Sequence, residues 1–412
     1  MITLTKPKKR NRWPSRVLFV TAAAIVLGYG GLRVVQWWMG GPASSTVEAS
    51  APQHLENAAR FIAEGKLDEA ASALDPILKH AHHETMTTDA FLLMARIETT
   101  RGNNAAAHSF LDRVSSEYPQ SPNRPKAMLA KARLLEKEQR FDEAVGIYQE
   151  AKDSLPKEFQ AAALTGLARH AERSNNLVEA LGHYREAAAI APWDSADWNE
   201  AVDGLGKANV TLIFSPVETP ESKAYAVERG DSLTSIGMKL NTTIGLLTRA
   251  NNLPEDASLQ VGQALKWTPK DFRIIVERST NRLFLMDNGG VFKRYGTGLG
   301  KPGYETALGS YKIGSKQKDP TWFKPGEGPI PAGDPRNELG TRWMPLVPLE
   351  ESLPTDLGIH GALDPSTIGK YSSNGCARMA MPDVEELYDL VVRSTPVTIV
   401  DVFPEDLRGQ AS

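Results

Sequence analysis

Residues 53–192 carry an internal repeat, and this repeat restricts the possible folds of the chain more than any other feature. Turn-forming residues recur every 36 or 37 positions, at Gly65, Gly102, Gln139 and Asn175. Each is followed after five residues by an alanine, and each alanine is followed after four residues by a large side chain, at Leu74, Leu111, Tyr148 and Tyr184. The turns separate segments with the apolar spacing of amphipathic helices. Because one such hairpin cannot bury its apolar face alone, the repeat predicts four stacked helical hairpins.

The repeat resembles the tetratricopeptide repeat, whose usual length is 34 residues. The resemblance implies an all-α domain over residues 53–208, closed by a helix near residues 194–206. Stacks of this kind have a concave surface, so one interpretation is a docking site for a protein partner. The other interpretation is a spacer that holds the rest of the chain away from a membrane. The sequence favours neither.

The first 39 residues have the pattern of a membrane anchor. Residues 1–16 are rich in lysine and arginine, and residues 17–32 contain no charged side chain. Arg33 interrupts the apolar stretch, but Trp37 and Trp38 extend it to about the length that crosses a bilayer. We expect residues 1–16 to be cytoplasmic, residues 17–39 to form one transmembrane helix, and the remainder to be exported. A cleaved signal peptide is the alternative, because small residues follow at positions 40, 41, 43 and 44.

Residues 223–269 follow a linker at residues 215–222 that contains two prolines. A short strand pattern at Tyr225 and Val227 precedes two short helical patterns and a final apolar segment that includes Leu265. This order resembles a LysM module, a small βααβ unit that binds glycans containing N-acetylglucosamine. The resemblance implies glycan strands as a partner, recognised largely by the backbone of residues 230–234 and 251–254. A βααβ adaptor without a ligand is the alternative.

From Phe272 onward the apolar period changes to two, which predicts a mainly-β domain over residues 271–402. The expected strands occupy residues 273–277, 282–286, 291–295, 310–313 and 397–401, and one helix is expected over residues 382–393. The segment between them at residues 317–339 is rich in glycine and proline and is expected to be a loop. Long loops on a β scaffold often line an active site.

Cys376 is the only cysteine of the 412 residues, so no intramolecular disulfide can form. Seven of the eight histidines lie at or before residue 183, and the eighth, His360, lies sixteen residues before Cys376. An imidazole that takes the proton of a thiol makes it a nucleophile. The backbone N–H groups of Gly375 and Cys376 suit an oxyanion, and Arg378 suits an acidic peptide substrate. A buried, inert thiol is the alternative.

The segment 359–379 resembles the signature of the L,D-transpeptidases with a YkuD-type β-rich domain, in which a His-Gly pair precedes a Ser-His-Gly-Cys-Ile-Arg motif. Segments 296–303, 306–313 and 339–344 also follow the family order, so the resemblance covers residues 272–401. It implies that Cys376 is the nucleophile, that His360 is the base, and that a backbone carbonyl near Gly361 orients the imidazole. Three positions depart from the pattern, namely Asn374 for histidine, Ala377 for isoleucine and Ala307 for proline. Asn374 still donates a hydrogen bond but cannot titrate.

The resemblance implies a bacterial enzyme, and the N-terminal pattern predicts that it lies in the inner membrane with a single span and a periplasmic or otherwise extracytoplasmic catalytic portion. Cys376 would form a thioester with the third residue of a tetrapeptide stem of peptidoglycan, release D-alanine, and pass the acyl group to an amine. Water or a protein amine as acceptor would instead make a carboxypeptidase or an anchoring enzyme, and a non-catalytic cell-wall scaffold is a further alternative. We expect no cofactor, no metal and, at a net charge of -3, no nucleic acid partner.

Overall fold

The computed structural model of the chain describes residues 42–80, 83–288, 290–324 and 326–408. These residues belong to two compact units, Met1–Arg140 and Phe141–Ser412. The predicted cytoplasmic segment, residues 1–16, and the predicted transmembrane helix, residues 17–39, lie outside the described residues, so both stay predictions. Within the described ranges, no helix has both the length and the apolar character needed to cross a membrane.

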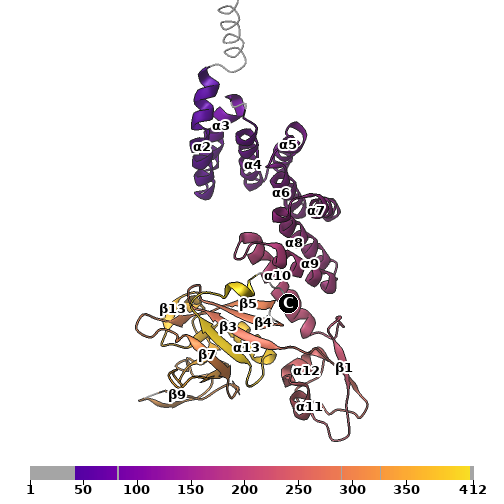
Figure 1. Ribbon diagram of the computed structural model, residues 1–412, viewed down its shortest axis with the longest axis vertical. Helices are drawn as coiled ribbons and strands as arrows, with labels where there is room; N and C mark the ends of the chain where they lie inside the picture. The colour runs from indigo at the N-terminus through magenta and orange to yellow at the C-terminus, as the bar shows by residue number, and fades with distance from the viewer. Residues whose placement is uncertain (1–41, 81–82, 289, 325, 409–412) are drawn as a thin grey trace, which may run out of the picture. The chain divides into compact units, whose positions relative to one another are not determined.

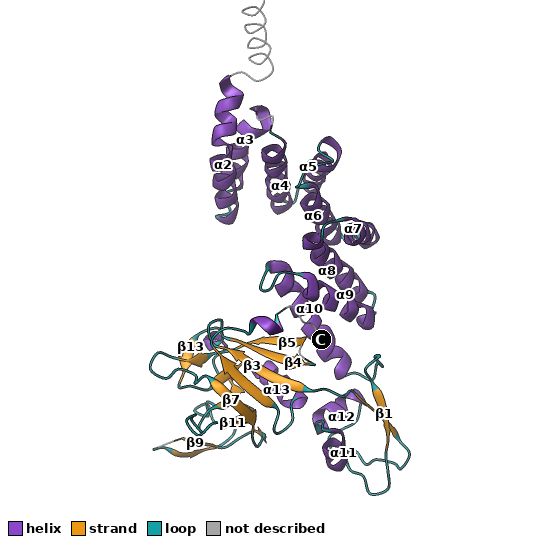
Figure 2. Ribbon diagram, in the orientation of Figure 1, coloured by secondary structure: helices purple, strands orange, loops and turns teal. Residues whose placement is uncertain are grey.

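The first unit is entirely helical over its described residues (Figures 1 and 2). The turn residues of the repeat adopt positive φ, at 75° for Gly65 and 80° for Gly102, because the chain reverses direction there. Ala70 and Ala107 are fully buried, which allows neighbouring helices to approach closely. The helices are α2 (Pro42–Ala63), α3 (Leu67–His80), α4 (Glu84–Arg101), α5 (Asn104–Glu117) and α6 (Arg124–Lys137).

The second unit begins with four more helices, α7 (Phe141–Ser154), α8 (Lys157–Arg173), α9 (Leu177–Ile190) and α10 (Ala196–Ile213). The repeated tyrosine fills the space left by a glycine. Tyr148 of α7 lies against Gly166 of α8, and Tyr184 of α9 lies against Gly204 of α10, where a Cβ atom would overlap the ring. Each aromatic ring therefore needs a glycine on the helix it packs against. The predicted all-α region is confirmed, whereas the likeness to tetratricopeptide repeats remains a resemblance of sequence.

Residues 223–267 form the predicted βααβ unit, with β1 (Lys223–Ala226), α11 (Leu233–Leu240), α12 (Ile244–Ala250) and β2 (Ala264–Trp267). The two strands pair antiparallel, with Tyr225 opposite Leu265. Ser232 and Ser235 form a capping box at the start of α11, and Thr243 caps α12. Val227, Ile236, Leu247 and Leu265 are buried together in a small core of their own.

The remainder of the unit is built on a nine-stranded sheet with the order β14-β12-β11-β7-β15-β3-β4-β5, and β8 pairs with β11 (Figure 2). Two smaller sheets pair β9 with β10 and β6 with β13. The strands are β3 (Phe272–Glu277), β4 (Arg282–Asp287), β5 (Gly290–Gly296), β6 (Leu299–Gly300), β7 (Gly309–Ile313), β8 (Gln317–Lys318), β9 (Trp322–Lys324), β10 (Gly328–Ile330), β11 (Arg342–Pro348), β12 (Gly358–Gly361), β13 (Tyr371–Ser373), β14 (Ala377–Met379) and β15 (Pro396–Val400).

Both faces of β3 and β4 are buried, because alternate side chains enter two different cores. Ile274 and Leu285 join the core beneath α13 (Met381–Leu390), whereas Ile275 and Phe284 join a core that they share with α8, α9 and α10. Helix α10 lies along β5, and the side-chain amide of Asn209 donates to the Phe292 carbonyl at 2.9 Å (Figure 1). The last helices of the repeat region are thus part of the same compact unit as the sheet.

Several expectations for the β region need correction. Residues 317–339 are not purely a loop, since they include β8, β9 and β10. Strand β11 was not expected because Pro345 and Pro348 interrupt its pattern. Strand β12 was not expected because all four of its residues are buried and show no alternation. The helix expected to reach residue 393 ends at Leu390, where Lys316 Nζ donates hydrogen bonds to the carbonyls of Tyr388 and Val391.

Phe284→Ala is expected to lower the free energy of unfolding of this unit by about 3–5 kcal/mol, as for other buried aromatic side chains. Phe284 is fully buried between the helices and the sheet, with ring centroids at 4.7 Å from Phe403 and 5.9 Å from Trp193. Urea denaturation measures the change. Phe323→Ala, at a side chain that is 75% exposed, is the matched control and should change stability little. Equal effects of the two substitutions would contradict the shared core.

Candidate active site

His360 lies on β12, which is flanked by β11 on one side and β14 on the other. It pairs with Trp343 across the antiparallel ladder and with Arg378 across the parallel one. Paired side chains share a face of a sheet, so these three residues lie on one face, while Ile359 and Ala377 enter the core on the other. Cys376 immediately precedes β14 and is two residues before Arg378. The two halves of the predicted pair, His360 and Cys376, are therefore brought together by neighbouring parallel strands.

The imidazole of His360 is buried and has a defined tautomer. Its Nδ1 lies 2.8 Å from the Gly361 carbonyl oxygen, which can only accept, so Nδ1 carries the proton of the neutral ring. Burial lowers the pKa of His360 to about 4, although the carbonyls of Gly361 and Glu338 act in the opposite direction. At neutral pH the ring is consequently an uncharged base.

Gly358 leaves room for this arrangement. A Cβ atom at Gly358 would overlap the Trp343 indole, whose ring centroid is 5.9 Å from that of His360. The N–H of Gly358 also forms a hydrogen bond with the Cys376 thiol and thereby favours the thiolate. A side chain at residue 358 would displace Trp343 from its position beside the imidazole.

The turn before Cys376 is held by two hydroxyl groups. Ser373 Oγ accepts from the Gly375 N–H at 3.2 Å and donates to the Cys376 carbonyl at 2.7 Å. Thr306 Oγ1 donates to the Gly375 carbonyl at 2.7 Å and accepts from the Gly300 N–H at 3.0 Å. Gly375 has a φ of 117°, a conformation that other residues rarely adopt. These bonds fix the backbone that presents the nucleophile.

The same bonds change the expected oxyanion site. The Gly375 N–H already donates a hydrogen bond to Ser373 Oγ. Of the two backbone donors expected to bind an oxyanion, only the Cys376 N–H therefore remains free. The Cys376 N–H has no hydrogen-bond partner within the described part of the chain. Asn374 is exposed beside this turn, so its side-chain amide is accessible to a ligand.

The thiol of Cys376 is partly buried and uncharged in this state. Its sulfur lies 3.8 Å from the Asp356 carbonyl oxygen, a weak hydrogen bond, and no bond to His360 is formed among the described residues. Burial raises the pKa of Cys376 to about 11, and the Asp356 carboxylate acts in the same direction. The structure thus has a neutral thiol beside a neutral imidazole rather than an ion pair.

Arg378 has a protein carboxylate as its partner. Its Nη2 lies 2.6 Å from Glu338 Oε2, and the Arg378 side chain is 18% exposed. Glu338 is fixed by its neighbours, because the buried Asn337 side chain donates to the carbonyls of residues 320, 330 and 331, and the Leu339 carbonyl accepts from Gly361 N. A substrate carboxylate would have to compete with Glu338 for Arg378.

Sequence reasoning missed four residues that support the site: Trp343, Gly358, Glu338 and Asn337. Trp343 and Gly358 meet only through strand pairing, and Asn337 and Glu338 lie in a segment expected to be a loop. Ser373 and Thr306 belong to motifs that were noted, but their hydrogen bonds depend on the folded turn. The signal that was available is the density of glycine, serine and threonine around Cys376.

Alkylation of Cys376 by iodoacetamide should become about tenfold faster for each pH unit between pH 7 and pH 10. The reason is that the thiolate is the reactive form and the pKa of the thiol is about 11, so the thiolate fraction rises tenfold per unit below that pH. Intact mass gives the rate directly, since the chain has one cysteine. A rate that is constant between pH 6 and pH 8 would show a preformed thiolate and contradict this account.

Two family models match the chain after the helical repeats. The L,D-transpeptidase catalytic domain (YkuD) matches residues 271–399, and the LysM domain matches residues 225–268. YkuD of Bacillus subtilis, which is named as an L,D-transpeptidase, is 32% identical over 181 residues, or 42% of this chain and 97% of its own length. The chain belongs to the L,D-transpeptidase family. YqjB of the same organism is also 32% identical, over 32% of this chain and 73% of its own length.

Solved L,D-transpeptidase structures also align with the chain. One from Mycobacterium tuberculosis H37Rv is 16% identical, covers 35% of this chain and 74% of its own, and has a TM-score of 0.26. The catalytic domain from E. faecium is 23% identical, covers 31% of this chain and 96% of its own, and has a TM-score of 0.26. These identities and TM-scores are low. The assignment to the L,D-transpeptidases is therefore based on the family models and the Bacillus relatives.

Proposed function

We propose that this protein is a peptidoglycan L,D-transpeptidase, a cysteine acyltransferase with Cys376 as nucleophile and His360 as base. The observation that carries the proposal is the placement of His360 on β12 beside the strand that follows Cys376, with its Nδ1 bonded to the Gly361 carbonyl. This bond leaves Nε2 as the proton acceptor. The family membership supports the substrate class.

In the first half-reaction, Cys376 Sγ bonds to the carbonyl carbon of the third residue in a tetrapeptide stem, and its proton passes to His360 Nε2. The resulting oxyanion is stabilised by the Cys376 N–H, with Asn374 as a further donor. When the intermediate collapses, the amide bond to the terminal D-alanine breaks and the D-alanine nitrogen takes the proton from His360. The products are a thioester on Cys376 and free D-alanine.

In the second half-reaction, an amine from another stem attacks the thioester carbonyl and gives its proton to His360. The amide bond forms, the carbon–sulfur bond breaks, and the sulfur recovers the proton. Water as acceptor would give a carboxypeptidase product, and an amine on a protein would give an anchored protein. Arg378 orients the donor stem when a carboxylate of that stem replaces Glu338 as its ion-pair partner.

The test is incubation of the purified protein with tetrapeptide muropeptides, followed by mass spectrometry of the products. We expect dimers crosslinked between two third residues, together with D-alanine. Tripeptide monomers alone would indicate water as the acceptor. The absence of any D-alanine release would contradict the acyltransferase and favour a cell-wall scaffold that does not catalyse.

The other modules have proposed roles in the same setting. The LysM module binds glycan strands through residues 230–234 and 251–254, and soluble N-acetylglucosamine oligomers should then release the protein from insoluble peptidoglycan.

Residues 17–39 anchor the chain in the inner membrane with the catalytic portion on the periplasmic side, which reporter fusions on either side of this segment would test. The helical repeats dock a protein partner or act as a spacer.

A further inference from the structure

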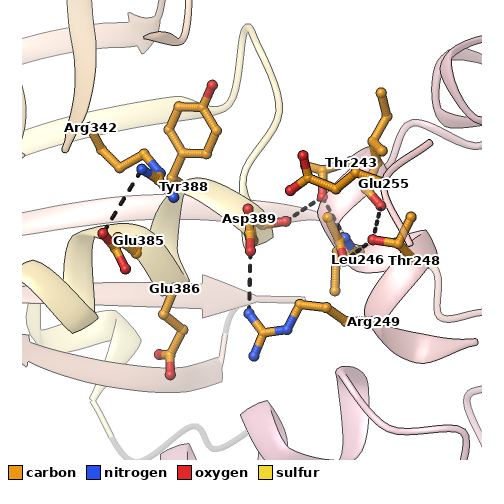
Figure 3. A network of polar contacts seen from close by, with 12 residues as sticks. Thr243, Leu246, Thr248, Arg249, Glu255, Arg342, Glu385, Glu386, Tyr388 and Asp389 are labelled. Carbon is orange, nitrogen blue, oxygen red and sulfur yellow. Dashed lines mark hydrogen bonds and ion pairs between the residues drawn. The ribbon is translucent and has the colours of Figure 1, made fainter. Parts of the chain in front are cut away.

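A cleft of about 560 Å³ lies between the LysM module and the catalytic domain. Helices α11 and α12 form one wall, and β8, β11 and α13 contribute residues to the other. His360, Cys376 and Arg378 do not line it. Figure 3 shows residues from both walls, with Arg342 and Tyr388 on the catalytic side and Thr243 and Glu255 on the LysM side. The cleft is therefore separate from the proposed active site.

Direct contacts fix the two walls. Thr243 Oγ1 donates to the Asp389 carbonyl, and Arg249 Nη1 lies 3.3 Å from Asp389 Oδ2 (Figure 3). Gly245 lies so close to the Asp389 carboxylate that a Cβ atom at this position would overlap it. These bonds join the LysM helices to the end of α13, so the width of the cleft is set before any ligand arrives.

The lining carries four cationic side chains and two carboxylates. Both carboxylates have basic partners, since Asp389 pairs with Arg249 and Glu255 pairs with Lys318 at 3.3 Å. Lys316 and Arg342 both approach the Tyr388 ring, at 4.1 Å and 5.2 Å from its centroid. The cleft therefore has an excess of positive charge concentrated around one aromatic ring.

Arg342 has unused hydrogen-bonding capacity. Its Nη1 donates to the Thr341 carbonyl at 2.8 Å and is 3.9 Å from Glu385, whereas its buried Nε has no hydrogen-bond partner within the described ranges. The Arg342 side chain is only 12% exposed, so its Nε–H has lost its hydrogen bond to water and gained none from the protein. Arg393 is exposed at the rim of the same cleft. A carboxylate in the cleft would meet both of these cations.

The cleft is continuous with the two segments proposed to bind glycan. Thr234 ends the first segment, residues 230–234, and also lines the cleft. Glu255 directly follows the second segment, residues 251–254, and lines it as well. Met238, which is 74% exposed, adds apolar surface to the LysM wall. A group attached to a glycan strand on these segments would extend into the cleft.

We infer that this cleft binds the carboxylate-bearing peptide stem of the glycan strand held by the LysM module. Stem peptides carry free carboxylates for Arg342 and Arg393 and small methyl groups for the apolar surface. The bound stem is distinct from the donor at Cys376, so the enzyme holds one strand by sugar and peptide together while it acts on another. This inference rests on the proposed peptidoglycan substrate.

The test compares two soluble glycan oligomers, one with intact tripeptide stems and one from which an amidase has removed the stems. The full-length protein should bind the stem-bearing oligomer about three- to tenfold more tightly, and the difference should shrink at high salt. The R342Q/R393Q variant should lose this preference and keep its affinity for the stem-free oligomer. The K207Q/R273Q variant is the matched control. It also removes two positive charges, but at exposed positions outside the cleft, and should retain the preference.

Equal affinity of the wild-type protein for both oligomers would overturn the inference. So would an unchanged preference in R342Q/R393Q. An equal loss for both oligomers would also overturn it, because these residues would then support the LysM fold instead. A parallel assay of D-alanine release from a soluble tetrapeptide stem separates the two proposals. Release without a stem preference refutes only the cleft, whereas no release refutes the proposed reaction.

Discussion

Cys376→Ala is expected to reduce D-alanine release from a tetrapeptide stem to the uncatalysed background, a loss on the order of 10⁶-fold for an enzyme that depends on one nucleophile. No other thiol in the chain can replace it. The side chain is small and partly exposed, and the turn around it is held by Ser373 and Thr306 through backbone atoms. The substitution should therefore leave the fold unchanged, which thermal denaturation will show.

Ser372→Ala is the matched control for this experiment. It also removes one side-chain heteroatom four residues from Cys376, and the Ser372 hydroxyl has no hydrogen-bond partner among the described residues. We expect turnover close to that of the wild-type protein. Turnover in Cys376→Ala within tenfold of the wild-type value would remove Cys376 from the mechanism.

His360→Ala should lower kcat by about 10²- to 10⁴-fold at pH 7, the usual cost of losing a proton-transfer partner. Without the imidazole, the thiol must ionise into solvent, and its pKa of about 11 makes the thiolate scarce at this pH. The deficit should decrease as the pH rises towards 10, because the thiolate then forms without a base. Rates of D-alanine release between pH 6 and pH 10 measure both the loss of kcat at pH 7 and its decrease at higher pH.

Because His360 is buried, its removal also leaves a cavity beside Trp343. His360→Gln keeps a polar side chain of similar length that can still donate to the Gly361 carbonyl, yet it cannot accept a proton at neutral pH. It should be as inactive as His360→Ala while unfolding at nearly the wild-type temperature. An active His360→Gln variant would mean that the ring only positions its neighbours.

The sequence predicted the strands of the catalytic domain that are rich in apolar and β-branched residues and are bounded by turn residues. β3, β4, β5, β7 and β15 fall within two residues of the expected strands. β11 and β12, which carry Trp343 and His360, did not follow the rule, because one contains two prolines and the other is buried on both faces. The strands that build the site are thus the ones with the weakest local signal.

His360 and Cys376 could be singled out from the sequence because one is the only histidine after residue 183 and the other is the only cysteine. The hydrogen bond from Gly375 to Ser373 and the ion pair of Arg378 with Glu338 were not, because they depend on the folded turn and on a segment 40 residues away. The burial of Phe284 in the core shared with α8, α9 and α10 was also beyond sequence patterns, which predicted separate helical and catalytic domains. A continuous apolar run such as residues 283–286 indicates that both faces of a strand are buried, but not what covers them.

The thioester itself can be detected from the intact mass of the protein within seconds of mixing with a tetrapeptide stem whose side-chain amine is acetylated, so that no amine acceptor is present. We expect a mass increase equal to the corresponding tripeptide stem minus one water, located on Cys376 by peptide mapping, with one equivalent of D-alanine released. Cys376→Ala should show no increase. Release of D-alanine without a covalent adduct on Cys376, or an adduct on any other residue, would contradict the thioester mechanism.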